Sequence, residues 1–135
     1  MESLKVKQFM TNNKLSFTKE MSLETAVDKL LTSDLLGGPV VDDEGLVVGW
    51  LSEQDCLAQI TEGSYYSEYA ALVGDVMSTV PLTVSHNLSI VDLALKLIKE
   101  KPKMYPVLDE EDRYVGIITR KAVLGAMNNQ LTKHK

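Results

Sequence analysis

One hairpin sequence is written twice in this chain. Residues 39–49 read PVVDDEGLVVG, and residues 106–116 read PVLDEEDRYVG. Each has an acidic turn between two runs of mainly apolar residues, which is typical of a β-hairpin. The similarity extends outward without a gap, since residues 6–57 align with residues 73–124 at a constant shift of 67. We therefore expect two copies of one structural unit that pack against each other, with a cleft between them.

Helical patterns flank each hairpin. Ser22 and its counterpart Ser89 are the predicted N-caps of a helix in each copy. Short strands are predicted before these helices, at 15–17 and 82–84, and closing helices after the hairpins, at 53–60 and 120–128. Apolar residues follow each N-cap at the spacing of a helix with one buried face: Leu23, Ala26, Val27, Leu30 and Leu31 in the first copy, and Ile90, Leu93, Ala94, Leu97 and Ile98 in the second.

The predicted repeat is β-α-β-β-α, and the fold class is α/β (α+β), with two repeats about a pseudo-two-fold axis. The first two strands of each repeat are joined by a helix, so we expect them to be parallel, with a right-handed crossover. Repeat 1 spans residues 6–60, a linker spans 61–72, and repeat 2 spans 73–128. Because 135 residues make one domain of ordinary size, each repeat is a subdomain.

Composition excludes several classes of protein. The formal charge is −5, with 19 acidic and 14 basic residues and no basic run, which argues against nucleic-acid binding. No apolar stretch is long enough to span a membrane, and the first residues lack the apolar core of a signal peptide. A single cysteine suits a reducing compartment. We therefore expect a cytoplasmic protein.

Three motifs resemble the CBS domain, a family named after cystathionine β-synthase. They are the Val-x-x-x-Met spacing at 6–10 and 73–77, the Pro-Val-x-Asp turns at 39–42 and 106–109, and the segment GWLSEQD at 49–55. The resemblance covers residues 6–128. It implies a tandem pair, or Bateman module, whose clefts often bind adenosine-containing molecules. It also implies homodimers formed by stacking two such pairs into a disk.

The sharpest candidate site is Ser52-x-x-Asp55, at the junction of a predicted strand and its closing helix. One interpretation is a capping box that only starts the helix. The other is a ligand site, because a helix start favours a phosphate and the resemblance implies that Asp55 accepts hydrogen bonds from ribose hydroxyls. One pair of residues can serve both purposes.

The second copy departs from this pattern. It reads Thr119-Arg120-Lys121-Ala122, so the hydroxyl is kept and the carboxylate is replaced by alanine. Any ribose contact from this half is therefore in doubt. Arg120 and Lys121 are either phosphate-neutralising cations or solvent-facing charges.

Three further residues complete the predicted ligand-binding set. Gly38 and Pro39 follow Gly37, and glycine permits close approach of a ligand to the backbone, although a helix C-cap also explains a glycine here. Tyr105 aligns with Gly38 and either stacks on a base or fills the space. Tyr65, Tyr66 and Tyr69 of the linker are alternative stacking partners, or they pack against the protein.

Catalysis and metal binding find little support. Cys56 occupies an apolar helix position, which favours a buried thiol. His86 lies in a predicted loop, and we expect no acidic or cysteine neighbour arranged for a catalytic triad. The two histidines and the cysteine lie on separate predicted elements, so no metal site is expected. We predict that the protein is not an enzyme.

The sequence therefore predicts a regulatory module that binds AMP, ADP, ATP or S-adenosylmethionine in the cleft between its repeats and requires no cofactor. It would act in trans on a separate protein that the sequence does not identify. The alternative is a ligand-free module for dimerisation or protein interaction. The intact Ser52/Asp55 pair favours the first hypothesis, and the lost carboxylate at Ala122 favours the second.

Overall fold

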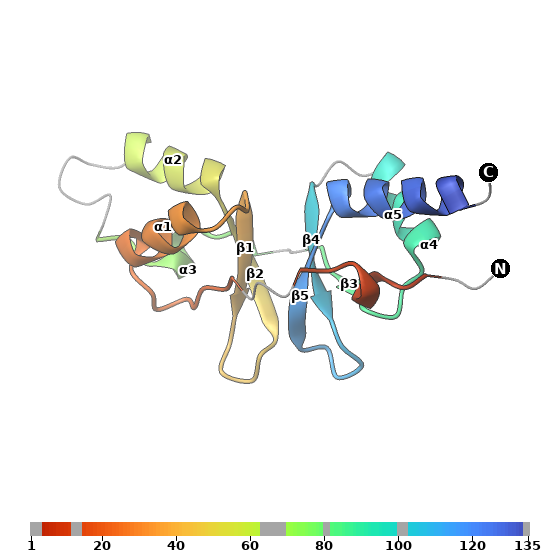
Figure 1. The fold of residues 1–135 in the computed structure, drawn as a ribbon. Helices are drawn as coiled ribbons and strands as arrows, with labels where there is room; N and C mark the ends of the chain where they lie inside the picture. Colours follow the sequence, from red (N-terminus) through yellow and green to blue (C-terminus); the bar gives the residue numbers. More distant parts are fainter. Residues whose placement is uncertain (1–3, 12–14, 63–69, 80–81, 100–102, 134–135) are drawn as a thin grey trace. The chain divides into compact units, whose positions relative to one another are not determined.

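The computed structural model describes residues 4–11, 15–62, 70–79, 82–99 and 103–133, which Figure 1 traces from red to blue. Its internal contacts divide the chain into two compact units. The first-repeat unit comprises Leu15–Pro81. The second-repeat unit comprises Leu82–Lys135 together with Met1–Lys14. Both units combine helices with strands, so the fold is of the mixed α/β class that the sequence predicts.

The first-repeat unit contains a two-stranded antiparallel sheet. The sheet consists of β1 (Gly37–Val41) and β2 (Val47–Ser52). The strand expected at 15–17 is reduced to one parallel bridge between Phe17 and Val40. Phe17 is still bonded on both sides, because its N–H donates to the Pro39 carbonyl at 3.0 Å and its carbonyl accepts from the Val41 N–H at 2.8 Å. The expected parallel direction is confirmed.

The second-repeat unit has a three-stranded sheet in the order β3-β4-β5. Here β3 (Val84–Ser85) is parallel to β4 (Met104–Leu108), and β4 is antiparallel to β5 (Tyr114–Thr119). The first strand begins at Val84 rather than at the expected residue 82. Val84 pairs with Val107 at the positions that Phe17 and Val40 occupy in the other unit, so the two crossovers share one geometry.

Serine caps start the two crossover helices, as predicted. The Ser22 hydroxyl accepts from the Thr25 N–H at 3.2 Å, and the Ser89 hydroxyl accepts from the Asp92 N–H at 3.1 Å. Each bond satisfies one N–H that the helix itself leaves without an acceptor. The helices are α1 (Leu23–Thr32), α2 (Glu53–Glu62) and α3 (Val73–Val76) in the first-repeat unit, and α4 (Ile90–Lys99) and α5 (Arg120–Lys133) in the second-repeat unit.

The buried face of each crossover helix is narrower than predicted. Leu31 of α1 is 75% exposed, and its counterpart Ile98 of α4 is 79% exposed, so their assignment to the buried stripe is wrong. The physical reason is their position eight residues after Leu23 and Ile90, on the flank of the stripe. A sheet of two or three strands does not extend far enough to cover that flank.

The N-terminal segments of the two repeats are exchanged. Val6 is fully buried in the core of the second-repeat unit, and its counterpart Val73 is fully buried in the core of the first-repeat unit. Backbone bonds hold both in the same way, since Val6 N–H donates to the Leu88 carbonyl and Val73 N–H donates to the Met21 carbonyl, each at 2.9 Å. Packing therefore crosses the boundary between the sequence repeats.

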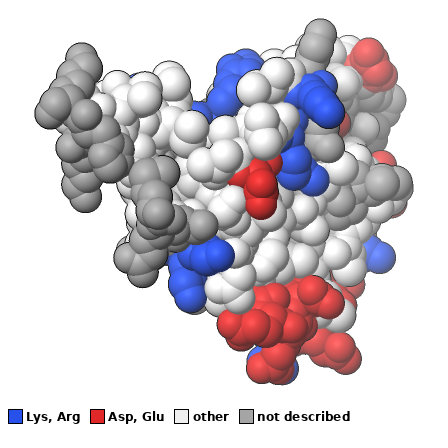
Figure 2. All heavy atoms as spheres, turned by 90° about the vertical axis from the view of Figure 1, so that its right-hand side faces the viewer, with Lys and Arg blue, Asp and Glu red and all other residues white. Residues whose placement is uncertain are grey.

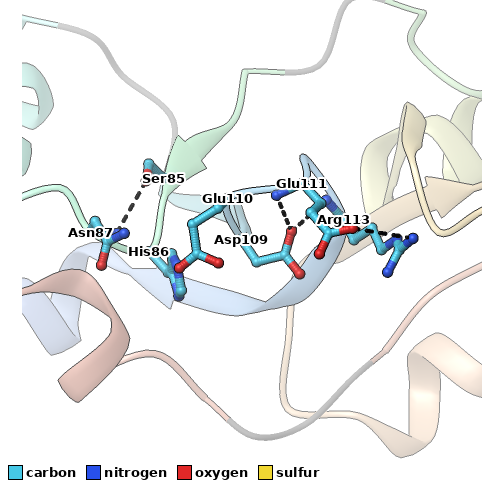
Figure 3. Close-up of polar contacts among 7 residues, drawn as sticks. All are labelled: Ser85, His86, Asn87, Asp109, Glu110, Glu111 and Arg113. Atoms are coloured by element: carbon cyan, nitrogen blue, oxygen red, sulfur yellow. Dashed lines mark hydrogen bonds and ion pairs between the residues drawn. The ribbon is translucent and has the colours of Figure 1, made fainter.

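Acidic turns close both hairpins. Asp109 Oδ1 accepts from the Glu111 N–H at 2.8 Å and the Arg113 N–H at 3.0 Å (Figure 3). Asp42 Oδ1 accepts from Glu44 and Leu46 in the same way, at 2.9 Å each. On the face of the second-repeat unit in Figure 2, acidic side chains gather at the lower end, over the β4–β5 turn. These aspartates therefore order the turns, and their neighbours face solvent.

Candidate functional site

Ser52 and Asp55 form a reciprocal capping box at the start of α2. The Ser52 N–H donates to Asp55 Oδ2 at 3.0 Å, and the Asp55 N–H donates to Ser52 Oγ at 3.1 Å. Both residues are half-buried. The structural interpretation of this motif is therefore correct, because the pair satisfies two backbone donors at the helix start.

The same pair keeps hydrogen-bonding capacity. Asp55 Oδ1 has no partner among the residues that the structure describes, and the Ser52 hydroxyl uses only its acceptor side in the capping box. An ionised carboxylate oxygen accepts hydrogen bonds, and a hydroxyl also donates one. The arrangement thus suits a ligand that offers hydroxyl donors, such as a sugar diol.

The start of α2 has fewer free N–H groups for a phosphate than the sequence predicts. The Glu53 N–H donates to the Leu36 carbonyl at 2.9 Å, and the Asp55 N–H is bound to Ser52. Two of the first three N–H groups are therefore already used. The expectation that free N–H groups at this helix start favour a phosphate needs this correction, since bound donors do not attract an anion.

Gly37 and Gly38 lie inside β1 rather than at the end of α1, whose C-cap is Ser33. The C-cap explanation for these glycines is therefore wrong. A Cβ atom on Gly37 would lie 2.7 Å from the Leu51 carbonyl oxygen, so the strand needs glycine there. A Cβ on Gly38 would lie 3.1 Å from side-chain atoms of Leu15 and of Phe17.

Gly38 and the adjacent Pro39 are both buried. Gly38 pairs with Leu51, and Pro39 pairs with Trp50, so both are held one strand away from the segment that leads to Ser52. The close neighbours of Gly38 belong to the protein's own core. Its small size therefore accommodates Leu15 and Phe17, and the ligand contact predicted for Gly38 and Pro39 stays a prediction.

Tyr105 is a core residue of the second-repeat unit, with only 1% of its surface exposed. Its ring therefore fills space in this core, and the stacking of Tyr105 on a base stays a prediction. The neighbouring residues are adjusted to match. Leu15, which packs on Gly38, is 7% exposed, whereas its counterpart Leu82 is 50% exposed. The two units thus fill equivalent space with different side chains.

The start of α5 repeats the cap without the carboxylate. Thr119 Oγ1 accepts from the Ala122 N–H at 3.1 Å, and the Arg120 N–H donates to the Lys103 carbonyl at 2.8 Å. Ala122 packs against the core. The side chains of Arg120 and Lys121 are exposed, and neither forms an ion pair within the part of the chain that the structure describes. Their role toward a phosphate stays a prediction.

Sequence reasoning missed an apolar groove between α1 and α2. It has a volume of about 250 Å³ and is lined by Leu31 and Leu57, which are exposed, with Cys56 at its base. Burial raises the pKa of the Cys56 thiol, and the nearby charges of Asp55 and Glu53 raise it further. Cys56 is 5% exposed, so the expected burial of the thiol is confirmed. Burial and a raised pKa both disfavour the reactive thiolate form. In the sequence, Leu31 and Leu57 are part of a helical pattern, which does not show that they are exposed.

His86 has one acidic neighbour that the sequence analysis did not predict, although the contact involves no nucleophile and so forms no catalytic triad. Its Nε2 lies 2.9 Å from Glu110 Oε1 of the β4–β5 turn (Figure 3). The sequence could not show this contact because 24 residues separate the pair.

Among the described residues, no group of three or more His, Cys, Asp or Glu side chains is arranged to hold a metal ion. Tyr65, Tyr66 and Tyr69 lie outside the described residues. None of the described helices is long and apolar enough to cross a membrane.

Comparison with known proteins now identifies the class. The CBS domain family model matches residues 6–62 and 73–129, so the chain belongs to the CBS domain family and carries two copies of the domain. It is 30% identical over 148 residues to the CBS domain-containing protein CBSX1, chloroplastic, of Arabidopsis thaliana. That match covers 90% of this chain and 63% of the relative, so the chain spans less than two thirds of that protein's length.

Two solved structures place the fold among CBS pairs. One is CBSX2 in complex with AMP, with 31% identity, a TM-score of 0.79, and coverage of 93% of this chain and 97% of that one. The other is the CBS domain pair of MJ0100 in complex with 5′-methylthioadenosine and S-adenosyl-L-methionine, with a TM-score of 0.76 and coverage of 96% and 99%. At 20% identity, the second likeness shows the fold alone.

Proposed function

We propose that this protein is a regulatory module that binds an adenosine-containing ligand at Ser52 and Asp55 of the first-repeat unit. The observation that carries the proposal is the Oδ1 atom of Asp55, which has no partner in the described parts of the chain, beside a hydroxyl that still has a proton to donate. The AMP complex of CBSX2, at 31% identity, supports an adenosine ligand. No cofactor is needed, because ligand occupancy shifts a conformational population without chemistry.

The bound state acts on a separate protein in trans. A ligand that favours one conformation changes the affinity for a partner only if the partner distinguishes the same conformations, and the coupling is then reciprocal. The proposed assembly is a homodimer, since apolar side chains stand exposed on the helices of both units: Leu31, Leu57, Val91, Leu95, Leu124 and Leu131. Location in the cytoplasm stays a prediction, and the relative CBSX1 is described as chloroplastic.

A second candidate function is a ligand-free dimerisation or interaction module. The exposed apolar groove between α1 and α2 favours it. The two candidates differ in one measurement, the melting temperature with and without adenosine, AMP, ADP, ATP and S-adenosylmethionine. A ligand at 100-fold excess over its dissociation constant adds about 2.7 kcal/mol to the free energy of unfolding. If none of the five ligands raises the melting temperature, the interaction module remains as the candidate function.

The site itself is tested by Asp55→Ala. Losing a charged acceptor for a diol weakens binding by about ten- to a hundred-fold. The matched control is Asp75→Ala, because Asp75 Oδ2 accepts from the Leu72 N–H at 3.3 Å at the start of α3 in the same unit. Both variants remove a capping carboxylate, and only Asp55→Ala should reduce affinity. Equal effects on binding would mean that stability alone had changed.

A further inference from the structure

The two units carry opposite charge. Residues 15–81 of the first-repeat unit contain 12 acidic and two basic side chains, a formal charge of −10. Residues 1–14 and 82–135 contain seven acidic and 12 basic side chains, a formal charge of +5. The chain's total of −5 conceals this separation. A ligand at Ser52 and Asp55 is therefore held by the strongly acidic unit, whose field repels anions.

Two of these acidic side chains lie at the site itself. Glu53 and Asp55 both lie in the first turn of α2, whereas the first turn of α5 has no acidic residue. A negative charge at a helix start is favourable for the helix, so α2 already has its counter-ions in its own side chains. An incoming phosphate would meet two carboxylates there.

The few cations of the first-repeat unit are engaged elsewhere. Lys29 Nζ donates to the Ser16 carbonyl at 2.6 Å and lies 5.7 Å from the centre of the Phe17 ring. Lys19 lines a hollow of about 280 Å³ beside the acidic β1–β2 turn, together with Asp42 and Asp43. These are the two basic residues of this unit, and α2 itself contains none.

The negative charges at the start of α2 affect the thiol of Cys56. Cys56 follows Asp55 in α2, and after burial the two largest causes that raise the pKa of its thiol are the charges of Asp55 and Glu53. A raised thiol pKa means that the surroundings oppose a new negative charge. The same opposition applies to an anionic group on a ligand bound at the start of α2.

We infer that the Ser52–Asp55 site selects against phosphate and takes an adenosyl ligand whose 5′ substituent is neutral or cationic, such as a thioether or a sulfonium, with Glu53 as the residue that sets this preference. This inference rests on the proposed function and narrows its ligand class. Asp55 accepts from the ribose, and Glu53, exposed at the first position of α2, repels a 5′ phosphate or attracts a sulfonium charge.

The sign of the salt dependence tests this preference without any variant. Adenosine, AMP and S-adenosylmethionine are titrated calorimetrically at about 20 mM and about 300 mM NaCl, since salt screens exposed charges within roughly 6–20 Å at these concentrations. At low salt AMP should bind about ten-fold more weakly than adenosine. On adding salt the AMP affinity should rise, the S-adenosylmethionine affinity should fall, and the adenosine affinity should change least.

A pair of charge-matched variants locates the effect. Glu53→Gln should raise the affinity for AMP relative to adenosine by about three-fold or more. Glu62→Gln removes the same charge from the other end of α2, where the residue is also exposed, and should leave that ratio unchanged. Equal effects of the two variants would overturn the role of Glu53.

AMP that binds as tightly as adenosine, and more weakly as salt is added, would overturn the selection against phosphate. If Asp55→Ala still abolished that binding, the proposed function would stand and only this inference would fail. If none of the three probes binds, the proposed function fails, and the inference fails with it.

Discussion

Gly45 and Asp112 occupy the same position in the two hairpin turns and share a left-handed backbone, with φ angles of 83° and 63°. Among the described residues, Asp112 is the one non-glycine residue with a positive φ. Glycine adopts this conformation without steric cost, whereas a residue with a Cβ atom does not. The second turn therefore holds a small strain that the first turn avoids.

Asp112→Gly should stabilise the protein for this reason. We expect a gain of about 0.5–1 kcal/mol in the free energy of unfolding, the relief of strain being partly offset by the greater entropy of glycine in the unfolded chain. Gly45→Ala should cost about 1 kcal/mol. Urea unfolding measures both. A destabilised Asp112→Gly variant would mean that the Asp112 side chain contributes more than its backbone costs.

Asp109 should make the free energy of unfolding depend on pH. Hydrogen bonds from the backbone N–H groups of Arg113 and Glu111 help to hold the pKa of Asp109 below its ordinary value. A carboxyl group whose pKa is lower in the folded state stabilises the protein above its unfolded pKa, and this contribution is lost as the pH falls through the folded value. Asp109→Asn should thus be less stable than the natural protein near neutral pH. The difference should shrink as the pH falls below about 4.

The control for this experiment is Glu111→Gln, which removes a nearby charge in the same turn. Its ion pair with Arg113 is exposed, with the two charged atoms 3.4 Å apart, and such pairs contribute little. Chemical unfolding from pH 7 to pH 3 separates the two. A gap between Asp109→Asn and the natural protein that stayed constant over this range would contradict the role of the charge.

Val6→Ala should destabilise the second-repeat unit, although Val6 is the first residue of repeat 1 in the sequence. Val6 is fully buried there, and removing two methyl groups from a core costs about 2 kcal/mol. Hydrogen exchange should accelerate in β3, β4 and β5 more than in β1 and β2. Val73→Ala is the matched variant and should show the reverse pattern. Faster exchange in β1 and β2 of Val6→Ala would contradict the exchange of segments.

Self-association should depend on the exposed helix faces. Leu95 is 57% exposed on α4, beside Val91 at 51%, and Leu95→Glu should shift a homodimer toward monomer because it buries a charge at the interface. Leu82→Glu is the control, since Leu82 is 50% exposed but precedes β3. Sedimentation or light scattering at micromolar concentration is the measurement. A monomeric natural protein would contradict the proposed dimer.

Ligand stoichiometry should be close to one per chain. Asp55 offers an oxygen to a ribose diol, and the equivalent Ala122 offers none. The preference for the first site should be about ten- to a hundred-fold. Calorimetric titration with adenosine measures the number of sites directly. Two equal sites per chain would show that the carboxylate is not what distinguishes the repeats.

Local signals in the sequence were enough to predict most of the fold. Ser22 and Ser89 mark helix starts by their own hydrogen bonds, and the Asp42 and Asp109 turns mark the hairpins. The Ser52–Asp55 box could be predicted because its partners are three residues apart. Such features depend on neighbours in the chain, and a repeated pattern makes each of them visible twice.

Features that depend on distant neighbours could not be predicted. Val6 and Val73 occupy equivalent positions in the repeats, so nothing local decides which core receives which valine. Tyr105 is buried in a unit where Leu82 is exposed, whereas Leu15, the counterpart of Leu82, is buried in the other unit. The N–H of Glu53 is used by a carbonyl at Leu36, on a segment 17 residues away. These contacts decide what the site can bind, and they appear only when the chain is folded.

The exchange of N-terminal segments sets an order for folding during synthesis. Residues 15–81 leave the ribosome as one continuous piece and can close their core first. The segment that contains Val6 is synthesised earlier, but it cannot complete its packing until β5 has been synthesised. The reason is that the Thr11 N–H donates to the Ile117 carbonyl of β5. The segment that contains Val6 and Thr11 is thus translated before the first-repeat unit but completes its packing after it. A pause in translation between the repeats would leave the first-repeat unit folded. The segment that contains Val6 would then remain unpacked, because the core that buries it would not yet exist.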